Sequence, residues 1–170
     1  VFEENGWTIP PSMAELDQLV AQIQDESPGQ LAPWCFAMQS GSATGWVATD
    51  WVEDLVLRFA GPEAYDEWAA GERRFDDPEI RQAFEAFDDL VVAQGRTTGD
   101  LRAILQTEVT RASAPLFDSS PGCAMYKQAS FAEAWFPDGT TIGDDVDFFV
   151  LPGSDTTGLA PLVTGGDSLV

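Results

Sequence analysis

The residues of this chain that could take part in chemistry are mainly acids and aromatics. Asp and Glu number 29, Lys and Arg together number 8, and there is no histidine. The missing histidine removes the commonest general base and metal ligand, and with it every Ser-His or Cys-His catalytic pair. Lys127 is the only lysine, so the chain has almost no residues that could carry out Schiff-base or P-loop chemistry. The GxSxG and GxGxxG motifs are also absent.

The densest candidate segment covers residues 45–54 and reads GWVATDWVED. Such a segment suits a sugar, because an indole face packs on the C–H face of the ring while a carboxylate accepts hydrogen bonds from its hydroxyls. We expect Asp50 to face the ligand and Glu53 and Asp54 to be solvated. The alternative is that Trp51 belongs to the core and that the acids only favour the start of a helix.

A second candidate segment, KQASF at residues 127–131, directly follows a short apolar run. Ligand contacts in α/β proteins lie beyond the carboxyl ends of the strands. The position of Phe131 therefore predicts a ligand-facing aromatic, with Trp135 and Phe136 further along. The alternative is that these aromatic side chains close the core.

The remaining acidic clusters predict less. Four aspartates near residue 140 would suit calcium by type, but their spacing does not match the DxDxDG loop, so we expect a solvated turn and no metal site. No acid pair stands out among the 29 as a glycosidase pair. Gly165, Gly166 and Asp167 form only a tight turn with an acid beside it. The four aspartates are Asp138, Asp144, Asp145 and Asp147.

The overall charge limits the possible partners. The net charge of −21 repels phosphate backbones and anionic lipid, which argues against nucleic-acid and membrane-surface binding. It would attract cations, so a polyamine is a possible ligand. No apolar run approaches the roughly 20 residues that a membrane helix needs.

The elements that must position these residues alternate between helices and short apolar strands, which predicts an α/β layered fold. Ser12 and Glu15 form a capping box, and Asp77-Pro78 is a second helix start. Cys35 and Cys123 form either one disulfide or two buried thiols. We expect helices over 12–26, 49–60, 62–70, 78–94, 101–105 and 108–117, and strands over 34–38, 123–126 and 146–151.

Several segments in order resemble extracellular solute-binding proteins of bacterial carbohydrate ABC transporters. The resemblance is to the α-glucoside-binding type, a relative of maltose-binding protein, and it covers nearly the whole chain. No single motif is diagnostic, but the ordered set is fairly specific. The segments are WTIP at 7–10, PWC at 33–35, TGW at 44–46, TDWVED at 49–54, FDDP at 75–78, PGCAM at 121–125, GDDVDFFVLP at 143–152 and GGD at 165–167.

This resemblance implies the C-terminal lobe of a type II periplasmic-binding-protein fold, with helices packed on a short mixed sheet. Residues 1–170 would be a single α/β lobe of a two-lobe receptor of about 400 residues, whose N-terminal lobe is missing here. The implied function is capture of a sugar outside the membrane for ABC permease subunits, without catalysis or cofactor. The implied location is extracellular or periplasmic, with a lipid anchor as one option for the full-length protein.

The resemblance also implies particular residue roles. Phe131 stands where maltose-binding protein has a tryptophan, so its stacking would be weaker or tuned to another sugar. A Cys35–Cys123 disulfide is implied because both residues flank the expected sheet. The implied ligand contacts are Trp46, Asp50, Trp51, Phe131, Gly165, Gly166 and Asp167.

Three other functions stay open at this point. A carbohydrate-active hydrolase fragment with paired acids would release reducing sugar. A polyamine receptor would use the negative charge of the chain. A purely structural or interaction lobe would bind neither ligand.

Overall fold

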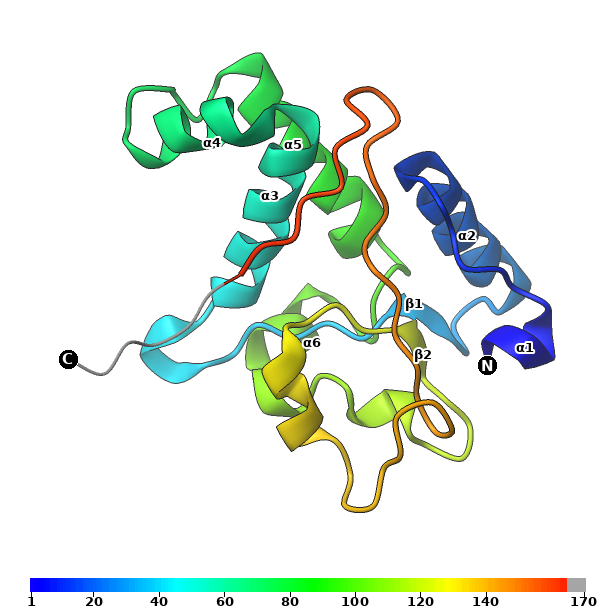
Figure 1. Ribbon diagram of the computed structural model, residues 1–170. Helices are drawn as coiled ribbons and strands as arrows, with labels where there is room; N and C mark the ends of the chain where they lie inside the picture. The colour runs from blue at the N-terminus through cyan, green and yellow to red at the C-terminus, as the bar shows by residue number, and fades with distance from the viewer. Residues whose placement is uncertain (165–170) are drawn as a thin grey trace.

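The structure is a computed structural model, and it describes residues 1–164 (Figure 1). Helices dominate, with short 3-10 turns between them and one π-helical turn after α5. The α-helices are α1 (Phe2–Asn5), α2 (Met13–Glu26), α3 (Trp46–Phe59), α4 (Gly61–Ala69), α5 (Pro78–Phe87) and α6 (Leu101–Gln106). The strands are β1 (Ala32–Trp34) and β2 (Cys123–Met125). The other turns are Gly41–Ala43, Asp88–Val92 (π), Val109–Arg111, Ala114–Leu116 and Ser130–Trp135.

The sheet of the described residues consists of β1 and β2, which pair in parallel with Trp34 opposite Met125. The strand expected at 123–126 is confirmed as β2, but the one expected at 34–38 is misplaced, because β1 ends at Trp34 and residues 35–38 are not in a strand. The third expected strand, at 146–151, is wrong, because within residues 1–164 this segment makes only an isolated bridge from Val146 to Ile142 and joins no sheet. Arg58, not a neighbouring strand, binds the carbonyl of Leu151 at 2.9 Å.

Two helix starts follow the predicted local rules. The Ser12 hydroxyl accepts a hydrogen bond from the Glu15 amide at 3.2 Å, and it caps α2. The Asp77 carboxylate accepts from the Glu79 amide at 3.1 Å at the start of α5. Both predicted starts are confirmed, because side-chain caps act locally.

Other local predictions are wrong. Helix α3 starts at Trp46, not near residue 49, because Gly45 has a left-handed backbone (φ 102°) that lets the chain turn directly into the helix. Residues 108–117 form two 3-10 turns and not one helix, since Pro115 lacks the amide that an α-helix would need there.

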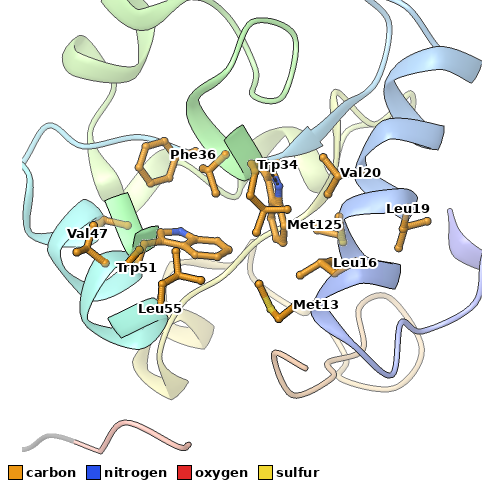
Figure 2. Packing of buried hydrophobic residues seen from close by; sticks show 14 of the residues in the cluster. Met13, Leu16, Leu19, Val20, Trp34, Phe36, Val47, Trp51, Leu55 and Met125 are labelled. Carbon is orange, nitrogen blue, oxygen red and sulfur yellow. Dashed lines mark hydrogen bonds between the residues drawn. The ribbon is translucent and has the colours of Figure 1, made fainter. Parts of the chain in front are cut away.

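The core lies between α2 on one side and α3 with α5 on the other (Figure 1). Trp34 of β1 is in the middle and packs edge-to-face on Trp51 of α3, with ring centroids 5.1 Å apart. Figure 2 shows Trp34 between Leu16 and Val20 of α2 and Trp51 and Leu55 of α3. Burial of these large side chains is the main stabilising term of the lobe.

Two further features connect distant parts of the chain. A disulfide joins Cys35, the residue after β1, to Cys123, the first residue of β2. Residues 151–161, called the strap here, run between α2 and α3 (Figure 1). Gly153 of the strap accepts a hydrogen bond from the Met13 amide at 3.2 Å. No helix within residues 1–164 has the length and apolarity needed to cross a membrane.

Candidate functional site

The carboxyl ends of β1 and β2 lie at the same edge of the sheet, because the strands are parallel. The chain after β1 leads to Trp46 at the start of α3, and the chain after β2 leads to Phe131. The rings of Trp46 and Phe131 are 6.0 Å apart, and Phe131 is 49% exposed. Trp135 extends the row, with its ring 5.2 Å from that of Phe131. We call this row the aromatic edge.

Asp50 lies one helical turn after Trp46 on α3 and is exposed. Partial desolvation raises the pKa of Asp50 above its usual value, although the nearby Lys127 ammonium lowers it. The carboxylates of Glu53 and Asp54 raise this pKa further. Asp50 is therefore an acid held near the aromatic edge in surroundings that disfavour its charge.

Trp51 does not lie on the surface with the aromatic edge. It is 1% exposed and packs on Trp34 within the core. A ring this buried is not accessible to a sugar from outside. Its position therefore matches the alternative prediction that Trp51 belongs to the core. The Trp51 ring does face Lys127, whose Nζ lies 4.8 Å from its centroid.

The two acids that were expected in solvent are partnered, so that expectation is wrong. Glu53 is half-buried and accepts a hydrogen bond from the Tyr65 hydroxyl at 3.2 Å. Asp54 is buried between two cations, with Arg58 at 2.6 Å and Lys127 at 3.0 Å. These partners come from the next helical turn and from the segment after β2, and they neutralise the buried carboxylate.

Three buried polar atoms on the segments that follow the strands have no hydrogen-bond partner among the described residues. They are Gln39 Oε1 after β1, and Tyr126 Oη and Gln128 Nε2 after β2. An unpaired buried polar atom costs about 1–3 kcal/mol. These atoms are covered by protein, as Trp51 is, so they are not counted as ligand contacts. Sequence reasoning missed them, although their positions just after the strands were an available signal.

The remaining candidates lie elsewhere. Gly165, Gly166 and Asp167 are outside the described residues. Asp145 accepts a hydrogen bond from the Thr141 amide at 2.8 Å in an exposed turn. Across residues 1–164, no three acidic or cysteine side chains gather as a metal site. Phe136 packs on Phe117, with ring centroids 5.0 Å apart.

Comparison with known proteins finds relatives among solute-binding proteins. No family model matches it. It is 39% identical over 89% of its length to the alpha-glucosides-binding periplasmic protein AglE of Rhizobium meliloti (strain 1021), of which it covers 32%. It is 33% identical over 98% of its length to the osmoprotective compounds-binding protein GgtB of Synechocystis, of which it covers 38%. A Pyrococcus horikoshii ABC transporter extracellular-binding protein is 30% identical over 49% of the chain, which covers 19% of it.

Two solved structures have a fold similar to that of the chain. The bacterial solute receptor AcbH, described as having an exclusive preference for β-D-galactopyranose, matches with a TM-score of 0.73 and 22% identity. A chitin oligosaccharide binding protein matches with a TM-score of 0.72 and the same identity. The chain is covered to 91% and 92%, and it covers 35% and 36% of these proteins. The chain is thus homologous to extracellular solute-binding proteins of ABC transporters, has the fold of part of such a protein, and spans about a third of their length.

Proposed function

We propose that this chain is one lobe of a two-lobe receptor that captures a sugar or oligosaccharide outside the membrane for an ABC importer. The observation that carries this proposal is the aromatic edge, where Trp46 and Phe131 lie 6.0 Å apart beside Asp50. The names of the relatives support a carbohydrate-type ligand, since AglE binds alpha-glucosides and AcbH prefers a galactopyranose. The other wall of the site belongs to the lobe that is missing here.

In the proposed binding mechanism, different residues bind the C–H face of the sugar ring and its hydroxyl groups. The C–H face of a sugar ring packs on the exposed ring of Phe131 and the half-buried ring of Trp46. Asp50, which is exposed, then pairs with a ring hydroxyl as the two lobes close. A hydroxyl buried without a partner costs about 1–3 kcal/mol, which is the source of specificity. Gly165, Gly166 and Asp167 remain proposed contacts from the resemblance.

A receptor fits the acids of this edge better than a hydrolase does. A glycosidase needs two carboxylates free to face the scissile bond. Here Glu53 is bound by Tyr65, and Asp54 is held by Arg58 and Lys127, which leaves Asp50 as the acid available to a ligand on this part of α3. We therefore propose binding without catalysis.

The proposed setting is extracytoplasmic. The Cys35–Cys123 disulfide is of the kind that persists in oxidising compartments, and the relatives carry periplasmic and extracellular in their names. The proposed partners are the permease subunits of the importer. A lipid anchor on the full-length receptor is part of the same proposal.

The proposal is tested on the complete receptor that carries residues 1–170. Its melting temperature is measured with maltose, trehalose, galactose or spermidine. We expect one of the sugars to raise the melting temperature by several degrees through preferential binding to the folded state, without releasing reducing sugar. Sugar turnover would instead identify a hydrolase. Stabilisation by spermidine alone would identify a polyamine receptor.

A further inference from the structure

Lys127 neutralises the buried carboxylate of Asp54 from outside α3. It follows β2, its side chain is 20% exposed, and its Nζ lies 3.0 Å from Asp54 Oδ2. The same Nζ lies 4.8 Å from the centroid of the Trp51 ring, which is a cation–π distance. The only lysine of the chain is therefore held from two sides, four residues before Phe131 of the aromatic edge.

The ammonium group of Lys127 has spare donor capacity. An ammonium carries three N–H donors and accepts no hydrogen bond. Within residues 1–164, the ion pair with Asp54 is the only polar contact of Nζ. Trp51 offers its ring face to the cation but no hydrogen-bond acceptor atom. Lys127 therefore keeps at least one N–H for an acceptor that arrives from the solvent side.

The group that holds Lys127 is itself fixed. Asp54 Oδ1 lies 2.6 Å from Arg58 Nη1, and Arg58 is 1% exposed. The other donors of Arg58 bind the carbonyls of Leu151, Pro152 and Pro161 in the strap. Asp54 thus binds a buried, hydrogen-bonded guanidinium with one oxygen and Lys127 with the other. The ammonium is presented in a preorganised position, which lowers the entropic cost of using it for binding.

We infer that Lys127 is a ligand-contacting residue of the proposed sugar-binding edge, held there by Asp54 and Trp51 as positioning residues. This inference rests on the proposed function. The ammonium donates to one sugar hydroxyl oxygen while Asp50 accepts from a hydroxyl, so the two residues together recognise a diol. The positive group also discriminates against cationic ligands, which a chain of net charge −21 would otherwise attract.

The contact is tested in the complete receptor by calorimetric titration with whichever of maltose, trehalose or galactose stabilises it most. Lys127→Met is expected to weaken binding about tenfold or more, and Lys127→Arg to lose less because it keeps the charge. Arg81→Met is the matched control, since it removes an exposed cation from the first turns of α5, away from the segments that follow the two strands. Affinity of Lys127→Met within about twofold of wild type overturns the inference.

The positioning role is tested without any sugar, on the chain itself. Reductive ¹³C-methylation labels Lys127 and the Val1 amine alone, because there is no other lysine. We expect the ring of Trp51 to shift the Lys127 methyl resonance away from its position in the unfolded chain. Asp54→Asn should abolish that shift, and Asp54→Glu should restore part of it. An unshifted wild-type resonance, or a shift that survives in Asp54→Asn, overturns the positioning role.

The two failures are distinguishable. A receptor in which Phe131→Ala weakens sugar binding and Lys127→Met does not would overturn this inference and leave the proposed function standing. A wild-type receptor that binds no sugar would overturn the proposed function and, with it, the ligand contact of Lys127. The methyl resonance would still report whether Asp54 and Trp51 hold the ammonium.

Discussion

Asp50 is an acid whose charge is disfavoured in the folded lobe. Partial desolvation raises the pKa of Asp50, and the neighbouring carboxylates add to this effect. Asp76, on the loop before α5, is the opposite case, since the hydrogen bond from Arg74 lowers its pKa. An acid kept in unfavourable surroundings beside exposed aromatic rings is expected where a ligand, and not the fold, uses the charge.

The sign of the pH dependence follows from this shift. A raised pKa means that the folded chain binds the proton of Asp50 more tightly than the unfolded chain does, so Asp50 lowers stability as pH rises through its pKa. Asp50→Asn is therefore expected to raise the melting temperature at pH 7, with the gain vanishing below about pH 3. Thermal melts of the chain from pH 3 to pH 7 measure this difference.

Asp76→Asn is the matched control for Asp50→Asn. The pKa of Asp76 is lowered, so its charge stabilises the fold at neutral pH, and its loss is expected to lower the melting temperature slightly or not at all. Equal responses of the two variants at pH 7 would show that Asp50 is an ordinary surface acid.

Among the elements, the strap depends on one buried side chain. Arg58 Nε donates to the Pro152 carbonyl at 3.0 Å, and Nη2 donates to Leu151 and Pro161 at 2.9 and 3.3 Å. The Thr157 hydroxyl returns a hydrogen bond to the Arg58 carbonyl at 2.5 Å. Residues at both ends of the strap are thus hydrogen-bonded to Arg58 of α3. They have irregular backbone instead of forming a third strand.

Arg58→Met is expected to destabilise the chain by about 3–5 kcal/mol, because it leaves strap carbonyls and one oxygen of buried Asp54 without their donor. Urea unfolding followed by tryptophan fluorescence measures the loss. Arg111→Met, at an exposed position, should change the free energy of unfolding by no more than about 0.5 kcal/mol. A loss below about 1 kcal/mol for Arg58→Met would mean that other contacts hold the strap.

Local and long-range features differ in how far the sequence predicts them. The starts of α2 and α5 were predictable because a cap and its helix are neighbours in sequence. The irregular end of segment 146–151 was not, because the Leu151 carbonyl is bound by a guanidinium about ninety residues away in place of a strand partner. The burial of Asp54 was missed for the same reason, since Lys127 reaches it from another segment. The meeting of Trp46 and Phe131 required the family resemblance, because no local pattern links them.

At the scale of the whole molecule, the net charge of −21 is a property of the surface as a whole and not of the proposed site. The edge proposed for the ligand includes the only lysine, and a buried arginine lies behind it. The chain spans about a third of the relatives it matches, so the described lobe presents one proposed wall of a cleft. Under the proposed function, an aromatic ring exposed on that wall would become covered when a second lobe closes on a sugar.

The most direct test of the account is a calorimetric titration of the complete receptor, and of its Phe131→Ala and Phe75→Ala variants, with the sugar that stabilises it. Phe75 is a matched control, because it is 69% exposed but lies between α4 and α5, where its ring contacts Trp68 and Phe84 and not the aromatic edge. The account predicts that Phe131→Ala weakens binding about tenfold or more, while Phe75→Ala stays within about twofold of wild type. Equal affinity of the two variants would contradict it.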